Sequence, residues 1–368
     1  MDNLEQISRN TDHRYYSRVS KIFNELLSEA YQSSKDEALL QYLDFEGINL
    51  FYERFVKQSK DADKIQLTCI LGSKLAKIHP TKVLGFFQKA YDFQNAHVDT
   101  NDEKILKVAE NVMMEQGLER DVPKLYTFAY SHTKNSTYAE KAYELMEKYE
   151  QDLPSFVRER VNDVDHFSLD FLQKLVSEAE KSNLSREKLI LYRAIYDKTQ
   201  TEEALRKWVT EAEQYKYGGD LADCFKEVPK VIPKDKAILI KAAKFAEENR
   251  DYAQALICLE KILELKEILP STRQKALIKS AEAAAKTKQY SKAMKFYEIL
   301  ASEEKILKKR ILYLKEAATN AEAASEWKKV IEFNKILFDS ARISVEKTNY
   351  RKKIAKGESN LKLLNKKK

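Results

Sequence analysis

The stretch "DYAQALICLEKIL" occupies residues 251–263, and two variants of it follow along the chain. "QYSKAMKFYEIL" begins at Gln289, and "EWKKVIEFNKIL" begins at Glu326. Each version has an aromatic residue in second place and continues with apolar residues three or four positions apart, which is the spacing of an amphipathic helix. The aromatic residues are separated by 38 and then 37 residues, so one helical phrase recurs at a nearly constant interval.

The agreement between the copies extends to four columns of small or aliphatic residues, counted from the aromatic residue. They are Leu239, Leu277 and Leu314 thirteen residues before it; Ala243, Ala281 and Ala318 nine before; Ala246, Ala284 and Ala321 six before; and Ala255, Ala293 and Val330 three after. Small residues on a first helix let a second helix approach closely, and the aromatic residue packs at the turn between them. Such a hairpin cannot bury its apolar face alone, so consecutive hairpins are expected to stack.

This pattern resembles the tetratricopeptide repeat (TPR) family in a degenerate form, most clearly over residues 235–340. The small residue on the first helix, the aromatic residue that opens the second helix and the alanine three positions later match the family. The family's aromatic residue on the first helix is replaced by Ala246, Ala284 and Ala321. The resemblance implies an all-α fold, an α-solenoid of antiparallel helix hairpins in a TPR-like right-handed superhelix with no β-sheet. Such folds mostly bind other proteins.

Composition supports the helical fold, because the 368 residues include only 7 Gly and 6 Pro and therefore few turn formers for β-hairpins. We divide the chain into a polar N-terminal tail (1–12), an irregular helical-repeat region (13–230), TPR-like repeats with a capping helix (231–346) and a basic C-terminal tail (347–368). Helical spacing from Val330 to Ile343 predicts one last helix there. Residues 350–368 are expected to fold poorly alone, so removing everything after Val345 should change the melting temperature little.

The net charge of +7 is concentrated at the C-terminal end. Residues 341–368 hold ten Lys or Arg and two Glu, a net charge of +8, so the other 340 residues sum to −1. A basic segment of this kind can bind nucleic acid, an anionic membrane or an acidic protein, or it can be only a solvated end. The candidate anion-binding residues are Arg351, Lys352, Lys353, Lys356, Lys366, Lys367 and Lys368.

A second candidate surface follows from the resemblance, in which the first helix of each hairpin lines the inner groove. The outward positions one turn from the small residue carry mixed charges, and we treat them as candidate partner-binding residues. They are Lys244, Glu247, Lys275, Glu282, Lys315 and Glu322. The alternative interpretation is an ordinary charged helix face with pairs three and four residues apart.

Sequence motifs for catalysis and cofactors are absent. The chain has no GxxxxGK, GxGxxG, GxSxG or HExxH pattern, so we predict no enzymatic activity and no cofactor. In "NDVDHF" (162–167), Asp163, Asp165 and His166 could suggest a metal site. We favour instead a polar link in which Asp165 or Ser168 caps the following helix, and we predict no metal.

Three scattered cysteines, Cys69, Cys224 and Cys258, cannot form a disulfide framework and are expected to be buried thiols. The polar N-terminus has no signal-peptide core, and no stretch is long and apolar enough to span a membrane. These features predict an intracellular, cytoplasmic protein.

The sequence leaves three functions open. The first is a non-enzymatic scaffold or adaptor that binds a protein partner, as a peptide or helix, through its helical-repeat surface or groove. The second is a nucleic-acid-associated α-solenoid that uses its basic tail for phosphate contacts. The third is a ligand- or peptide-sensing regulator.

Overall fold

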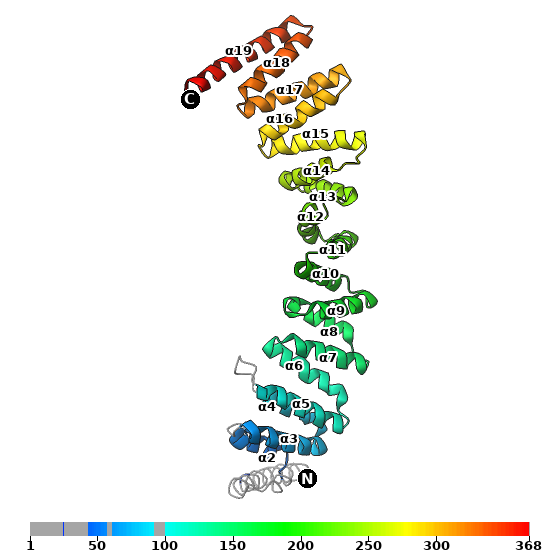
Figure 1. The fold of residues 1–368 in the computed structure, drawn as a ribbon. Helices are drawn as coiled ribbons and strands as arrows, with labels where there is room; N and C mark the ends of the chain where they lie inside the picture. Colours follow the sequence, from blue (N-terminus) through cyan, green and yellow to red (C-terminus); the bar gives the residue numbers. More distant parts are fainter. Residues whose placement is uncertain (1–24, 26–42, 57–60, 92–99, 368) are drawn as a thin grey trace, which may run out of the picture. The chain divides into compact units, whose positions relative to one another are not determined.

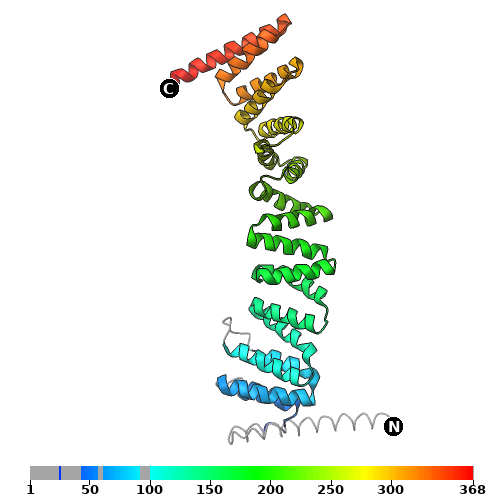
Figure 2. The same ribbon diagram turned by 45° about the vertical axis from the view of Figure 1, so that its right-hand side comes forward.

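The computed structural model describes residue 25 and residues 43–56, 61–91 and 100–367 (Figure 1, Figure 2). The chain forms two compact units, Met1–Glu187 and Lys188–Lys368. All regular secondary structure in the described ranges is helical, and no strand occurs there. Helices pack mainly against their neighbours in the chain, so the fold is all-α and built from TPR-like helix hairpins, as predicted. The predicted tail 1–12 lies outside the described residues.

The second unit contains the three predicted hairpins. They pair α13 (Lys236–Glu248) with α14 (Tyr252–Glu264), α15 (Pro270–Lys286) with α16 (Tyr290–Glu303), and α17 (Leu307–Ala323) with α18 (Trp327–Ser340). Each second helix begins at the aromatic residue of the repeated phrase. Before the hairpins come α10 (Ser185–Thr199), α11 (Glu202–Tyr215) and α12 (Gly218–Val231), and after them comes α19 (Ser344–Lys367). The aromatic residue therefore marks the start of the second helix, as the spacing predicts.

The four repeated columns form the core of these hairpins. All twelve residues are buried, with no more than 6% of any of them exposed. A further buried column, which the sequence analysis missed, lies ten residues before the aromatic residue and consists of Ala242, Ser280 and Ala317. Four small columns in all allow the helices to pack at close range, and Met294, Phe333 and Leu337 fill the remaining space in the core around α16 to α18.

The turns inside the hairpins are closed by residues in the left-handed backbone region. Arg250, Lys288 and Ser325 have φ angles of 60°, 59° and 58°. The N–H group that follows each of them donates to a carbonyl of the buried alanine column, and the three donor–acceptor distances are 2.8, 2.8 and 2.9 Å. This is the helix-ending arrangement that normally uses glycine. Because the chain has few glycines, charged or polar residues take this conformation here.

The first unit is less regular. It contains α2 (Phe45–Phe51), a π-helical turn (Tyr52–Val56), α3 (Asp61–Ile78), α4 (Pro80–Ala90), α5 (Thr100–Glu115), a 3-10 turn (Glu119–Asp121), α6 (Val122–Thr133), α7 (Ser136–Lys148), α8 (Leu153–Arg160), a 3-10 helix (Val161–His166) and α9 (Leu169–Lys181). Aromatic rings fill its core. Phe171 lies edge-on to both Tyr143 and Phe167, with ring centres 5.7 and 5.0 Å apart.

The C-terminal end corrects one prediction. The expected last helix ends at Ser340, where Ala341 becomes extended, and a new helix α19 runs from Ser344 to Lys367. Tyr350 and Gly357 on α19 are buried against α18, and a Cβ at Gly357 would lie 2.9 Å from Ile331. The basic segment is therefore a packed helix over its described length. The four-part division of the chain remains a prediction.

Two of the three cysteines are buried, Cys224 and Cys258, and Cys69 is half-buried. Burial raises the pKa of both buried thiols to about 12, so both remain protonated at neutral pH. Within the described residues, no helix is both long and apolar enough to cross a membrane.

Candidate partner-binding surfaces

The charged positions predicted on the first helices of the hairpins do not form one pocket. Four of the six take part in ion pairs within the chain, which are Lys244–Glu248 at 3.6 Å, Lys279–Glu247, Lys315–Glu346 at 3.9 Å and Lys356–Glu322. Lys275 and Glu282 are exposed, and neither has an ion pair among the described residues. Glu282 lies beside Glu247 and Lys286 in a small polar cleft of about 190 Å³.

Ion pairs between neighbouring hairpins recur along the second unit. Lys292 on α16 lies 2.8 Å from Glu260 on α14, and Lys329 on α18 lies 2.8 Å from Glu298 on α16. The first helices are connected in the same way, because Lys279 on α15 pairs with Glu247 on α13. In each pair the lysine lies on the later hairpin and the glutamate on the earlier one. Lys356–Glu322 shows that α19 takes the place of a further first helix. Exposed pairs contribute little stability each, and these four connect consecutive elements of the hairpin array.

The basic residues of α19 are only partly available. Lys356 is paired with Glu322, and Arg351 lies over the ring of Phe338, 5.3 Å from its centre. Lys352 and Lys353 are exposed and have no ion pair among the described residues. Lys366 and Lys367 belong to α19 by their backbone, their side chains are not described, and Lys368 lies outside the described residues.

The "NDVDHF" segment forms a polar link. Ser168 caps α9 by accepting from the N–H of Phe171 at 3.2 Å, which confirms one of the two predicted caps. Asp163 forms an ion pair with Lys134 at 2.9 Å. Across the part of the chain that the structure describes, no cluster of side chains could hold a metal ion.

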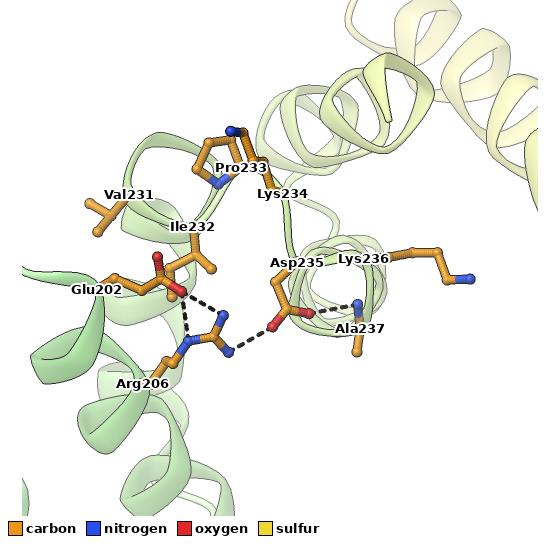
Figure 3. A pocket seen from close by; sticks show the side chains of 9 residues that line it. All are labelled: Glu202, Arg206, Val231, Ile232, Pro233, Lys234, Asp235, Lys236 and Ala237. Carbon is orange, nitrogen blue, oxygen red and sulfur yellow. Dashed lines mark hydrogen bonds and ion pairs between the residues drawn. The ribbon is translucent and has the colours of Figure 1, made fainter. Parts of the chain in front are cut away.

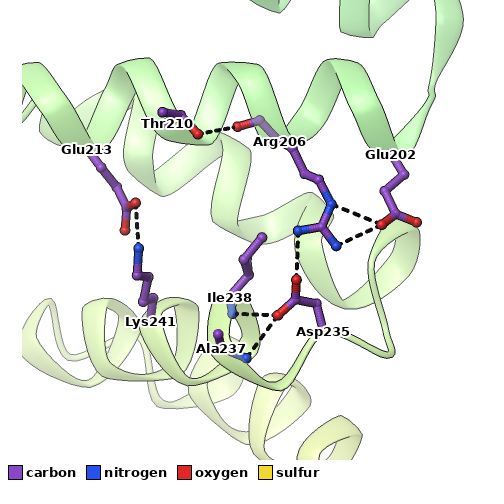
Figure 4. A network of polar contacts seen from close by, with 8 residues as sticks. All are labelled: Glu202, Arg206, Thr210, Glu213, Asp235, Ala237, Ile238 and Lys241. Atoms are coloured by element: carbon purple, nitrogen blue, oxygen red, sulfur yellow. Dashed lines mark hydrogen bonds and ion pairs between the residues drawn. The ribbon is translucent and has the colours of Figure 1, made fainter.

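A polar cleft of about 700 Å³ lies where α11 meets the start of α13 (Figure 3). Arg206 on α11 donates to Glu202 on the same helix and to Asp235, which is 2.6 Å away (Figure 4). Asp235 also caps α13 by accepting from the N–H groups of Ala237 and Ile238. The hydrogen bond from Arg206 is the main reason that the pKa of Asp235 is below its ordinary value. This satisfied network fixes the start of the first hairpin.

An apolar cleft of about 450 Å³ lies in the first unit. Phe128 of α6, Met146 of α7, and Phe156 and Arg160 of α8 contribute to its lining. Helix α8 has only 8 residues, whereas α6 has 12, and residues of both helices line the cleft. The size and the predominantly apolar lining are those of a site that accepts a large side chain or a small molecule.

Arg160 gives this cleft its chemical character. Its side chain is only 12% exposed, and its guanidinium lies over the rings of Tyr130 and Phe156, 5.2 and 5.9 Å from their centres. The nearest carboxylates, Glu159 and Asp163, are 3.8 and 3.9 Å away, beyond hydrogen-bond distance. Within the described residues the guanidinium has no hydrogen bond, and its buried Nε has no partner.

Sequence reasoning did not find this cleft. Arg160 lies just before the "NDVDHF" segment, whose carboxylates and histidine are a stronger sequence signal than the arginine beside them. The lining comes from four helices, α4, α6, α7 and α8, and from the link before α8. Its apolar positions have the spacing of ordinary core residues. A short helix that ends in arginine is a weak signal, visible only once the helix boundaries are known.

These features define the class of protein as an all-α helical-repeat chain of TPR-like hairpins with clefts on its helix faces. Similar solved structures include the TPR domain of P58(IPK), which is 13% identical, covers 81% of this chain and 98% of its own, and has a TM-score of 0.24. The TPR2AB-domain:pHSP90-complex of yeast Sti1 is 12% identical, with 81% and 99% covered and a TM-score of 0.24. Ton1535 from Thermococcus onnurineus NA1 is 15% identical, with 96% and 99% covered and a TM-score of 0.23. No protein-family model and no curated protein matches the chain.

Proposed function

We propose that the chain is a non-enzymatic adaptor that binds a protein partner, and that the cleft beside Arg160 receives part of that partner. The occupant is a peptide segment with a carboxylate next to a large apolar side chain. The observation that carries this proposal is the nearly buried guanidinium of Arg160, which lies in an apolar cleft without a hydrogen bond among the described residues.

Physical chemistry favours a carboxylate at this position. A guanidinium presents a planar set of N–H donors that matches the two oxygens of a carboxylate, and such charge-assisted hydrogen bonds are strong where water is excluded. Glu159 and Asp163 are too distant for this geometry, and Asp163 is already paired with Lys134. Phe128 and Met146 supply an apolar surface beside the guanidinium. The cleft therefore fits a bound group that is anionic at one end and apolar at the other.

The test is selection of peptides from a random display library on the immobilised full chain. We expect enriched peptides to carry Asp, Glu or a free C-terminal carboxylate within two residues of Leu, Phe or Trp. Their affinity should fall by roughly tenfold or more in Arg160→Met, as expected for a lost charge-assisted contact. Arg160→Lys should restore only part of the affinity, because an ammonium group cannot bind a carboxylate in two-point fashion.

Arg158→Gln serves as the matched control, since Arg158 is exposed on the same helix and does not line the cleft. It should bind the selected peptides as the wild type does. Melting of every variant by circular dichroism separates lost binding from lost folding. Peptides without an acidic group, or affinities that ignore Arg160 in a folded variant, would refute the proposed site.

The predicted positions on the hairpins remain a secondary proposal. Lys275 and Glu282 are the two of these six residues without an ion pair among the described residues. They would contact a partner that lies along the first helices. Exchanging their charges in Lys275→Glu and Glu282→Lys should weaken such a complex while the peptide affinity of the α6–α8 cleft stays constant. The proposed sensing regulator would use the same cleft with a free ligand in place of a partner segment.

A second candidate function is nucleic-acid association through α19. It is favoured by Lys352 and Lys353, which are exposed on this helix without ion pairs in the described ranges. Binding of single-stranded RNA or duplex DNA should be independent of sequence and should weaken steeply as salt rises. Lys352→Gln with Lys353→Gln should reduce both the affinity and the salt dependence. Binding that is absent at low salt would exclude this function.

A further inference from the structure

The second unit carries a row of exposed aliphatic residues along one edge. Leu269, Ile306 and Ile343 follow one another at intervals of 37 residues, and 64%, 54% and 60% of their surfaces are exposed. Leu269 and Ile306 directly precede the first helices of two hairpins, α15 and α17, and Ile343 directly precedes α19. Leu307 and Val345 lie beside them and are also exposed. We call these five residues the aliphatic edge.

The aliphatic edge is continuous within this unit. The three loops that carry it lie on the same side of the hairpins, opposite the turns at Arg250, Lys288 and Ser325 (Figure 1). Arg273 at the start of α15 lies 3.2 Å from Glu303 at the end of α16, which joins the first loop to the second. Lys315 on α17 and Glu346 on α19 lie 3.9 Å apart. This pair connects α17 with the helix that follows the third loop. The three loops that carry the exposed residues therefore follow one another along one side of the unit.

Helix stability does not explain these residues. Leu269 and Ile306 occupy the N-cap positions of α15 and α17, and neither forms a side-chain cap. Aliphatic residues are among the poorest N-caps, whereas Asp235 fills the same position of α13 with two hydrogen bonds. Solvent exposure also excludes a packing role. An exposed aliphatic residue that recurs three times at a constant interval, twice as a poor cap, points to recognition by something outside the chain.

The charges beside the aliphatic edge are mainly positive. The exposed cations without an ion pair among the described residues are Lys266, Lys305, Lys308, Lys309, Arg310 and Arg342. Three carboxylates near the edge, Glu267, Glu304 and Asp339, are also without an ion pair in the described ranges. The other carboxylates here are engaged by partners of the same unit, such as Glu303 with Arg273 and Glu346 with Lys315. The surface around the row therefore has an excess of available positive charge.

We propose that the aliphatic edge docks on an anionic lipid surface. Aliphatic side chains at loop ends can enter the boundary between head groups and acyl chains, while neighbouring Lys and Arg bind acidic head groups. None of the three clefts described above is lined by these residues, and 54–64% of the surface of Leu269, Ile306 and Ile343 is exposed. A lipid surface needs no complementary shape, whereas a partner helix would need a groove.

The experiment measures flotation of the full chain with vesicles of equal parts phosphatidylcholine and phosphatidylserine. We expect binding that is at least about tenfold weaker on pure phosphatidylcholine and that falls as salt rises. The key variant is the triple substitution Leu269→Ser, Ile306→Ser and Ile343→Ser. Serine is a preferred N-cap, so this variant should fold at least as well as the wild type while binding the vesicles about tenfold more weakly.

Matched controls separate the two contributions. Ile240→Ser with Ile257→Ser removes two exposed aliphatic residues from the middle of helices and should leave vesicle binding unchanged. Lys305→Gln, Lys308→Gln and Lys309→Gln together should weaken binding, whereas Arg250→Gln, Lys288→Gln and Lys328→Gln make the same charge change near the opposite turns and should not.

Three outcomes would overturn the proposal. The first is no binding to anionic vesicles at low salt. The second is binding that the triple serine variant leaves intact, which would indicate adsorption through charge alone. The third is a triple serine variant that leaves vesicle binding intact but loses a protein partner that the wild type binds, which would assign the edge to a protein interface.

Discussion

The three hairpins of the second unit bury alanine, whereas the first unit buries aromatic rings. Around α15 and α17 the close contacts come from residues such as Ala281, Ala284 and Ala317, none of which is exposed. In the first unit the corresponding space is filled by Tyr143, Phe167 and Phe171, whose rings meet edge to face. Small residues at the same positions set the same distance between helices in every hairpin. Aromatic rings can instead fill gaps of different sizes between helices of unequal length.

This difference explains where the apolar cleft occurs. The surface of the regular hairpins offers charged pairs, a small polar cleft and an exposed edge. In the first unit, the short helix α8 leaves an apolar cleft with Arg160 in its lining. Regular repetition thus favours stability and alignment, whereas the break in repetition produces a concave site.

The aromatic core of the first unit should be the most sensitive to truncation. Phe171→Ala removes a ring that is 1% exposed and contacts two other rings. We expect a loss of about 3–5 kcal/mol in the free energy of unfolding. Hydrogen exchange should show that α7 to α9 open first. A loss below about 1 kcal/mol, measured by denaturant unfolding, would mean that the rings do not form a tight core.

Removal of α19 should destabilise the last hairpin, in contrast to the expectation from sequence. A chain that ends at Val345 exposes Val330, Phe333 and Leu337, which are buried, and loses the contacts of Tyr350 and Gly357. We expect a loss of roughly 2–4 kcal/mol and earlier melting of α17 and α18. The control is a chain that ends at Leu363, which keeps both buried residues and should melt as the full chain does. Equal melting of all three chains would show that α19 contributes no stabilising contact.

Replacing a buried alanine of the hairpins by a larger residue should destabilise them, because the alanines are buried between paired helices. Ala281→Leu or Ala284→Leu should lower the free energy of unfolding by about 1–3 kcal/mol, because both alanines are fully buried between paired helices. The control Ala323→Leu lies on the exposed side of α17 and should be nearly neutral. Thermal melting of the three variants checks the expectation. A neutral Ala281→Leu variant would show that the helices can separate without cost.

Much of the fold could be predicted from the sequence, because in the hairpins helix spacing and tertiary packing follow the same 37-to-38-residue period. Two features of the same region were missed. The column Ala242, Ser280 and Ala317 contains a polar serine, so a search for recurring apolar residues does not find it. The buried stripe of α19 is narrow and includes Gly357, and the surrounding lysines suggested a solvated tail.

The candidate sites could be predicted far less well. From the sequence, a charged residue at an outward helix position seems free to bind a partner. The structure shows that Glu247 is paired with Lys279, and Glu322 with Lys356, on the next first-helix position of the array. The α6–α8 cleft depends on the distance between helices of unequal length, which no local pattern encodes. The position of Arg160 over the rings of Tyr130 and Phe156 likewise follows from tertiary packing.

The turns of the hairpins should gain stability from glycine. Lys288 has a φ of 59°, a conformation that an L-residue adopts at a cost and glycine adopts freely. We expect Lys288→Gly to raise the free energy of unfolding by about 0.5–1 kcal/mol. The control Lys295→Gly, at an exposed position within α16, should lower it by about 1 kcal/mol. If Lys288→Gly also destabilises, the left-handed conformation at this turn is not strained for lysine.

The smallest effect is expected where the regular array begins, at the ion pair between Arg206 and Asp235. The hydrogen bond from Arg206, followed by the N–H groups of α13, holds the pKa of Asp235 below its ordinary value of 3.8. The folded state therefore favours the ionised carboxylate. Its contribution is present at pH values above 3.8 and is lost as the pH falls through that value towards the lower folded pKa.

Asp235→Asn tests this ion pair because asparagine keeps the N-cap and removes the charge. We expect a loss of roughly 0.2–1 kcal/mol at neutral pH, since both side chains are partly exposed. The difference from wild type should shrink as the pH falls through 3.8 towards the lower folded pKa. Arg206→Gln should cost a similar amount, and the double variant should cost no more than either single one. Asp235→Ala should cost about 1 kcal/mol more at every pH, because it also removes the cap. Additive effects of the two single variants in urea unfolding would show that Arg206 and Asp235 act independently. The start of α13 would then depend on its cap alone.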